Sequence, residues 1–310
     1  MFRLAHVTDP HFRGSSPFAG AALGDFVGKR NTKRFVGALN LVVNRTRKHK
    51  MELLEALRED LRAQAVDHVA LTGDLSNIAI EAEWQSALRW LEAYGAAGDA
   101  VTVIPGNHDT YVEEVVQSRI FERLFAAYQT RDVAAGAAAE TYPFVRVRGG
   151  VALVAVSSCV PTGDLGAWGE VGAAQLARLE AALTEPAIVG KTRVVLIHHP
   201  PVLIKEGEQR NLKDRAALAA VLARAGADLV LHGHDHADER ATLDGPGGAR
   251  IPVVGAGSAS YAGAPDRRSR YNIYEIEGRA ITCVIRAHDE ASDQFREVRR
   301  EVLTWPSTPD

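Results

Sequence analysis

Short apolar runs alternate along the chain with longer segments in which apolar residues recur every three or four positions. The runs predict buried strands, and the periodic segments predict helices with one apolar face, as Leu53, Leu57 and Leu61 illustrate. In the first half, the predicted strands are 2–8, 68–72 and 100–104, and the predicted helices are 51–65, 81–93 and 112–128. Strands that alternate with helices predict a mostly parallel sheet with helices on its faces.

The second half continues this alternation and then changes. Residues 144–156 predict two strands joined at Gly149-Gly150. Further helices are predicted at 172–183 and 212–224, and further strands at 193–197 and 228–232. The last predicted strands, 251–257, 271–278, 279–287 and 296–305, have no helices between them and indicate an antiparallel tail. The pattern contains no repeat or linker, so we expect residues 1–310 to form one domain.

One stretch departs from the rhythm. Residues 12–50 form an insertion between the first predicted strand and the first predicted helix, longer than an ordinary connection. From Lys29 to Lys50 it has eight Lys or Arg and no acidic residue. Two interpretations stay open: an excursion that packs on the body of the protein, or a cap over the polar residues Asp9 and His11 that follow the first predicted strand. As a cap, residues 29–50 would make weak contact with a lipid-linked or other large anionic substrate, or with an anionic membrane surface.

Composition narrows the class of protein. Hydrophobic residues make up 46% of the 310 residues and charged residues 24%, which is typical of a soluble globular protein. The net charge of -3 gives no overall basic footprint, so we expect no nucleic-acid partner. The N-terminus shows no secretory leader, no apolar run could span a bilayer, and the two cysteines suit buried reduced thiols. We therefore expect a cytoplasmic protein.

Polar residues that can bind metal ions follow five of the predicted strands, each at the point where the strand ends. Because ligands of an open parallel sheet bind beyond the carboxyl ends of its strands, we expect these side chains to lie together. They are Asp9 and His11 in VTDPHF, Asp74 in LTGDLS, Asn107, His108 and Asp109 in PGNHDT, His198 and His199 in LIHHPP, and His234 and His236 in LHGHDH.

These residue types indicate a dinuclear metal site. Imidazoles mixed with carboxylates suit Mn, Fe, Zn or Ni and argue against calcium. In Asp-x-His and His-x-His, the spacing puts both side chains on one side of an extended segment. Two such pairs and a bridging carboxylate would hold two ions about 3.5–4 Å apart. Outside these motifs, His6, His49, His68 and His288 are interpreted as structural or solvated, and His232 as a core residue or one behind the ligands.

The ordered motifs D-x-H, G-D, G-N-H-D, H and G-H-x-H resemble those of the calcineurin-like metallophosphoesterase superfamily. The resemblance is closest to the bacterial branch with cyclic-nucleotide and glycerophosphodiester phosphodiesterases, and it runs from Asp9 to His236. It implies an α/β fold, a four-layer α/β/β/α sandwich, with which an antiparallel C-terminal tail agrees. The lengthened gap between His11 and Asp74 departs from the family pattern and leaves the substrate class open.

The resemblance also implies a role for each site residue. Asp9, His11 and His236 would hold one metal ion, Asn107, His198 and His234 the other, and Asp74 would bridge both. His108 would lie beside the substrate phosphate, with Asp109 orienting it. His199, the second histidine of the pair, is interpreted as a residue behind the ligands or a substrate contact rather than a ligand.

The implied activity is that of a metal-dependent phosphoric ester hydrolase, in which a hydroxide that bridges the two metal ions attacks phosphorus. The expected substrate is a small phosphodiester, such as a cyclic nucleotide or a glycerophosphodiester. A nucleotide-linked or lipid-linked pyrophosphate is the alternative. A non-catalytic binding scaffold is disfavoured, because all seven ligand positions and His108 are present.

Overall fold

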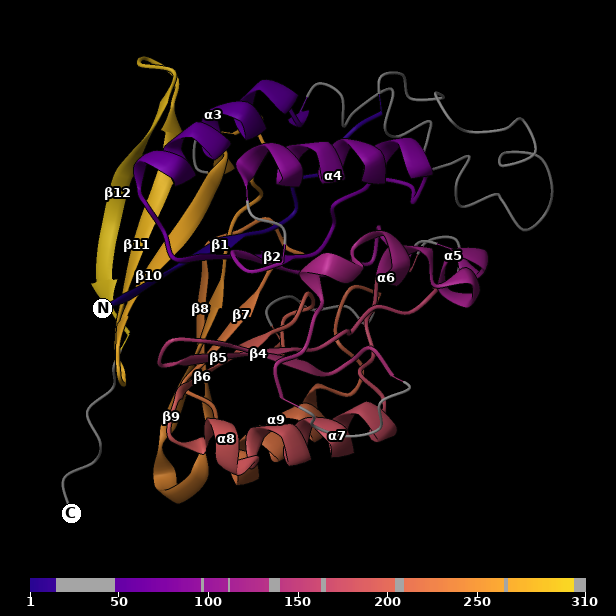
Figure 1. Cartoon of the computed structure of the whole chain (residues 1–310), viewed down its shortest axis with the longest axis vertical. Helices are drawn as coiled ribbons and strands as arrows, with labels where there is room; N and C mark the ends of the chain where they lie inside the picture. The colour runs from indigo at the N-terminus through magenta and orange to yellow at the C-terminus, as the bar shows by residue number, and fades with distance from the viewer. Residues whose placement is uncertain are drawn as a thin grey trace.

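Two β-sheets face each other in the computed structural model, and helices cover the outer face of each (Figure 1). The structure describes residues 1–14, 48–95, 98–110, 112–133, 140–162, 166–203, 209–264 and 267–303. Most of the predicted basic insertion, residues 15–47, therefore lies outside the described residues, as do residues 304–305 of the last predicted strand.

The first sheet combines parallel and antiparallel strands in the order β12-β11-β10-β1-β2-β3. Its parallel strands are β1 (Phe2–Val7), β2 (His68–Thr72) and β3 (Val101–Ile104). Its antiparallel strands are β10 (Arg270–Glu277), β11 (Ala280–Asp289) and β12 (Gln294–Val302). The helices α3 (Met51–Ala63) and α4 (Glu81–Tyr94) cover its outer face (Figure 1).

The second sheet has the order β4-β5-β6-β7-β9-β8. Its parallel strands are β5 (Val151–Ala155), β6 (Thr192–Leu196), β7 (Leu229–His232) and β9 (Arg250–Gly255). The edge strands β4 (Phe144–Arg148) and β8 (Glu239–Asp244) are antiparallel to their neighbours, and Pro246–Gly248 form a short 3₁₀ turn after β8. The helices α7 (Ala173–Leu183), α8 (Pro186–Val189) and α9 (Arg215–Ala225) cover the outer face (Figure 1).

The apolar core has one layer between the sheets and one beneath each set of helices. In β6, Val194 packs in the layer between the sheets, whereas Val195 packs with residues of α7 and α9. Because both faces of the central strands are buried, they read in the sequence as continuous apolar runs. The four layers confirm the predicted α/β/β/α architecture.

Two predicted elements were wrong in detail. The helix predicted over 112–128 is broken into α5 (Glu113–Ser118), α6 (Ile120–Leu124) and the 3₁₀ turn Ala126–Tyr128, because Arg119 adopts a left-handed φ of 51°. Val115 and Phe121 both enter the core, yet on a straight helix they would point about 120° apart. The break lets both side chains pack.

The predicted strand at 251–257 does not belong to an antiparallel tail. It forms β9, which pairs parallel with β7 and antiparallel with β8. The strand β8 was not predicted, because most of its residues are polar and half-buried. β8 is the edge strand of the sheet, and β9 lies between β8 and β7.

None of the helices in the described part of the chain has both the length and the apolar composition needed to cross a bilayer.

Candidate metal centre

The predicted site residues meet where the two sheets present the carboxyl ends of their parallel strands. Asp9, Asp74 and Asn107 follow β1, β2 and β3 of the first sheet. His198 and His234 follow β6 and β7 of the second sheet. The site therefore lies between the edges of two sheets and not along the rim of one, and the chain brings together residues up to 227 positions apart (Asp9 to His236).

Asp9, His11, Asp74 and His236 form the first cluster, with their candidate ligand atoms within 4.8 Å of one another. The Nε2 atom of His236 lies 3.1 Å from His11 Nε2 and 3.1 Å from Asp9 Oδ1. Asp74 Oδ2 lies 3.8 Å from His11 Nε2. Metal–ligand bonds of about 2.1 Å place neighbouring ligands about 3 Å apart, so this spacing fits one ion.

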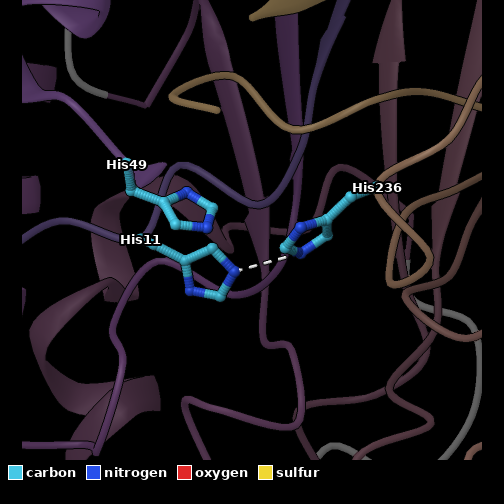
Figure 2. A group of neighbouring side chains, drawn as sticks. All are labelled: His11, His49 and His236. Atoms are coloured by element: carbon cyan, nitrogen blue, oxygen red, sulfur yellow. Dashed lines mark hydrogen bonds between the residues drawn. The ribbon is translucent and has the colours of Figure 1, made fainter. Parts of the chain in front are cut away.

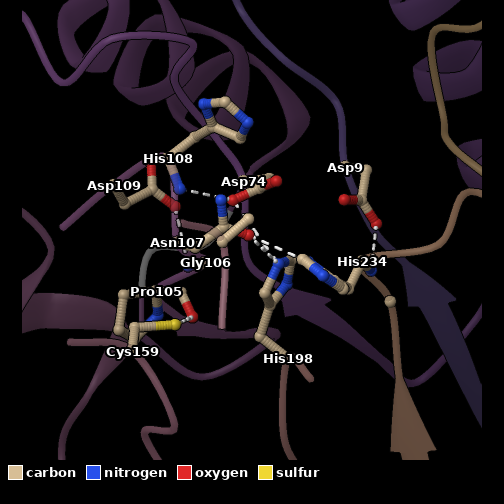
Figure 3. A network of polar contacts seen from close by, with 12 residues as sticks. Asp9, Asp74, Pro105, Gly106, Asn107, His108, Asp109, Cys159, His198 and His234 are labelled. Atoms are coloured by element: carbon tan, nitrogen blue, oxygen red, sulfur yellow. Dashed lines mark hydrogen bonds and ion pairs between the residues drawn. The ribbon is translucent and has the colours of Figure 1, made fainter. Parts of the chain in front are cut away.

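Asn107, His198 and His234 form the second cluster together with Asp74 (Figure 3). Asn107 Oδ1 lies 3.2 Å from His198 Nε2 and 2.9 Å from His234 Nδ1. Asp74 Oδ1 lies 3.5 Å from His198 Nε2. Asp74 thus turns one carboxylate oxygen toward each cluster, which is the arrangement of a bridging ligand.

The hydrogen bonds on the imidazoles show that both clusters fit metal ions. His11 Nδ1 donates to the Ser76 carbonyl at 3.1 Å, and His198 Nδ1 donates to the Thr72 carbonyl at 2.7 Å. Each Nε2 atom therefore turns a lone pair toward its cluster. Asp9 Oδ1 is buried and faces His236 Nε2 across the first cluster. Lone pairs that face one another repel unless a cation lies between them, so the donor sets fit two cations.

The electrostatics of the buried site agree with this fit. Burial, with the carboxylates of Asp9 and Asp109 nearby, raises the pKa of Asp74 well above its usual range. Burial and the rings of His199 and His198 hold the pKa of His234 well below its usual range, which keeps the imidazole in its neutral, ligating form. Positive charge from bound ions would offset the cost of burying the carboxylates.

The backbone at the ends of the strands is bent sharply. Five of the predicted ligands have left-handed φ angles: Asp9 (51°), His11 (47°), Asp74 (54°), His234 (75°) and His236 (52°). Residues other than glycine seldom adopt this conformation, and strain of this kind concentrates at functional sites. The bends direct the ligands away from their strands and into the space between the sheets.

Two glycines lie where the loops approach too closely for a side chain. A Cβ on Gly106 would overlap the backbone and the carboxylate of Asp74. A Cβ on Gly233 would overlap the Thr8 hydroxyl and approach the carboxylate of Asp9. The glycines before Asn107 and His234 are therefore required by close packing between loops.

His108 lies beside the first cluster, and the orienting role of Asp109 stays a prediction. The ring of His108 is 5.3 Å from that of His11, and its Nδ1 donates to the Asn77 carbonyl at 2.6 Å. The carboxylate of Asp109 accepts a hydrogen bond from the N–H group of Gly106 at 2.9 Å (Figure 3). It also accepts hydrogen bonds from the N–H groups of Leu75 (3.0 Å) and Ser76 (2.8 Å), on the loop after β2. Asp109 fixes these loops, and Asn77 fixes the ring. Backbone carbonyls leave no motif in a sequence, so Asn77 was not predicted.

His199 lies behind the ligands. Its Nε2 donates to the Ala167 carbonyl at 3.2 Å, and its Nδ1 accepts from the Ser158 hydroxyl at 2.8 Å. Both ring nitrogens are therefore engaged, and the ring packs 4.5 Å from that of His234. These contacts favour a supporting position over a ligand position.

The structure places one histidine at the site that the sequence interpretation left out. His49 is buried, and it joins His11 and His236 in a group of candidate ligand atoms within 4.8 Å of one another (Figure 2). The sequence pattern predicts no strand before His49 and no metal-binding motif surrounds it, so the sequence carried no signal for this position. His6 and His68, by contrast, make hydrogen bonds to Thr72 and Thr102, and burial lowers the pKa of each to about 3.

This fold and this constellation are those of a dinuclear metallohydrolase class. The chain belongs to the calcineurin-like phosphoesterase family, because a model of that family matches residues 2–238. The resemblance stated from the motifs is thereby confirmed.

A curated relative is also similar in sequence. It is a cAMP/cGMP dual specificity phosphodiesterase from Mycobacterium tuberculosis (strain CDC 1551 / Oshkosh), 29% identical over 216 residues. The match covers 68% of this chain and 59% of the relative, so the chain spans about three fifths of that protein's length.

Solved structures share the fold. A dimetal phosphatase from Danio rerio superimposes with a TM-score of 0.61 at 14% identity, covering 98% of this chain and 99% of that chain. A purple acid phosphatase from yellow lupin (Lupinus luteus) seeds gives a TM-score of 0.56 at 15% identity, covering 96% and 52%. At these identities the likeness establishes the fold alone.

Proposed function

We propose that this chain is a metal-dependent phosphodiesterase that hydrolyses a small phosphodiester, with a cyclic nucleotide as the first candidate. The observation that carries the proposal is Asp74, which turns one oxygen toward each of two ligand clusters. The mycobacterial relative supports the choice of a cyclic nucleotide, since its name describes hydrolysis of such diesters.

We propose that the chain binds two metal ions. One would be held by Asp9, His11 and His236, and the other by Asn107, His198 and His234. Asp74 would bridge the two ions. The mixed nitrogen and oxygen donors suit Mn, Fe, Zn or Ni. When bound, two such ions would lower the pKa of a water between them and neutralise charge on the phosphoryl oxygens.

The residues around the ions would orient the substrate and supply a proton. His108 Nδ1 donates to the Asn77 carbonyl, and His108 as an imidazolium would donate a proton to a phosphoryl or leaving oxygen. The backbone N–H of His108 donates to Asp74 Oδ1 at 2.8 Å and thereby fixes the bridging carboxylate. His108 would thus contact both the bridging carboxylate, through its backbone, and the substrate, through its side chain.

The test is reconstitution of metal-free protein. After dialysis against a strong chelator we expect no hydrolysis of 3′,5′-cyclic AMP. Mn, Fe, Zn or Ni, added singly, should restore it with two ions bound per chain by elemental analysis. A glycerophosphodiester and a nucleotide-linked pyrophosphate are assayed in parallel. Full activity in metal-free protein would refute the proposal, and hydrolysis of the pyrophosphate alone would refute the substrate class while leaving the metal site intact.

A further inference from the structure

His49 lies against the first ligand cluster, although it comes from the segment before α3 and not from a strand end. Its ring centroid is 4.8 Å from that of His11 and 5.6 Å from that of His236, and the rings meet edge to face at 69° and 83°. In Figure 2 a ring nitrogen of His49 points toward the space between the other two rings. Three imidazoles that converge in this way are typical of a metal site rather than of apolar packing.

The other ring nitrogen of His49 is held by the protein. His49 Nδ1 forms a hydrogen bond of 2.8 Å with the Ser260 hydroxyl. Metal-binding histidines commonly direct one nitrogen to the ion and donate from the other to a fixed oxygen, which sets the tautomer. The Ser260 hydroxyl is placed to do the same for His49.

The backbone around His49 is fixed to the body of the protein. Lys50 N–H donates to the Ser260 carbonyl at 2.9 Å, and Ala262 N–H donates to the Lys48 carbonyl at 2.6 Å. The Ser258 hydroxyl, two residues before Ser260, donates to the Asp9 carbonyl at 2.7 Å. The segment that carries His49 is thereby connected to the loop that carries a ligand of the first cluster.

We propose that His49 is an additional ligand of the first metal ion, which would then be held by Asp9, His11, His49, His236 and the bridging Asp74. This inference rests on the proposed dinuclear centre and goes beyond it. The first ion would have five protein ligands and the second would have four. The first ion would therefore be bound more tightly than the second.

The experiment measures metal binding directly. Metal-free wild type is titrated with Mn²⁺ by calorimetry, and bound Mn²⁺ is counted after gel filtration. We expect two binding steps, a tight one for the first Mn²⁺ ion and a weaker one for the second. His49→Ala should weaken the tight step by about 100-fold and leave the weaker step unchanged, and Ser260→Ala should weaken the tight step by about tenfold.

The matched control is His68→Gln, which alters another buried histidine at the start of β2, the end of that strand away from Asp74. It should leave both steps unchanged. If His49→Ala does not fold, as judged by circular dichroism, His49→Gln takes its place.

The outcomes separate this inference from the proposed function. Wild type that fails to bind two ions contradicts the proposed function itself. Wild type that binds two ions, with both steps unchanged in the His49 variants, overturns only the role of His49, even if KM for substrate rises. Equal weakening of both steps also overturns it, because the loss would then reflect general disruption of the site.

Discussion

The hydrogen bonds that each imidazole makes with the protein decide whether that histidine can bind a metal ion. In His11 and His198, Nδ1 donates to a backbone carbonyl, so Nε2 is left as a metal ligand. In His199, the residue after His198, both ring nitrogens form hydrogen bonds with the protein, so this histidine supports the ligands and does not bind a metal ion itself. The residue type alone does not distinguish these roles.

The His108→Ala variant tests the role of His108 as a proton donor. Alanine keeps the backbone N–H that holds Asp74, so the variant should still bind two metal ions. Turnover should slow by roughly 10² or more, and less for diesters with good leaving groups, which need no protonation. The measurements are metal content and kcat across leaving groups of different pKa.

Asp74→Ala is the contrasting variant, because it removes both bridging oxygens and should lose metal and activity together. Equal slowing of His108→Ala on good and poor leaving groups would count against proton donation and leave charge stabilisation as the role of His108.

At the scale of elements, the start of α4 supports the loop on which the site depends. Glu83, in the first turn of the helix, accepts hydrogen bonds of 3.0 Å from the N–H groups of Asn77 and Ile78. Asn77 in turn accepts the hydrogen bond from His108. This contact resembles a capping box, in which an acidic side chain reaches back to backbone donors before the helix.

Glu83 should make stability depend on pH. Burial raises its pKa from 4.5 to about 7. Between these values the folded protein keeps a proton that the unfolded chain releases, so the free energy of unfolding should fall as the pH rises from about 5 to 7.5. The loss would be on the order of 3 kcal/mol. Glu83→Gln keeps an acceptor and cannot titrate, so its stability should fall less over this range.

Urea unfolding of metal-free protein at several pH values measures both profiles. Other buried groups titrate in both proteins, so the difference between wild type and Glu83→Gln isolates the contribution of Glu83. Parallel profiles for the two proteins would show that Glu83 does not have the raised pKa.

At the scale of the whole molecule, the site exists because two sheets present their carboxyl edges to each other. β1, β2 and β3 supply one half, and β6 and β7 supply the other. The basic segment from Lys29 to Lys50 follows the loop of Asp9 and His11 in the chain, and we propose that its charge contributes to binding of large anionic substrates.

Replacing Lys29, Arg30, Lys33 and Arg34 with alanine tests that contribution. KM for large anionic substrates should rise by about tenfold, and the rise should shrink at high salt. The kcat for a small chromogenic diester should stay unchanged, because the ligands are untouched. Arg250→Ala, which removes an exposed charge at the amino end of β9, is the control. An unchanged KM for every large anionic substrate would favour the other interpretation, in which the basic insertion only packs on the body of the protein.

The sequence by itself determined the class of fold and most of the site. Strand and helix repeat with different periods, so β1, β2, α3 and α4 could be predicted from local pattern alone. The ligand motifs follow apolar runs directly, because loops at the ends of buried strands carry the function of such folds. Asp9, Asp74, Asn107, His198 and His234 could be predicted for this reason.

Only the tertiary structure decided the features that depend on contacts between distant segments. The break at Arg119 arises because Val115 and Phe121 must reach one core, and the position of β9 depends on pairing with β7. Asn77 orients His108 through a carbonyl that every residue type has. His49 reaches the first cluster through hydrogen bonds to Ser260, 211 positions away in the chain. Such contacts follow from packing in three dimensions, and no local pattern in the sequence encodes them.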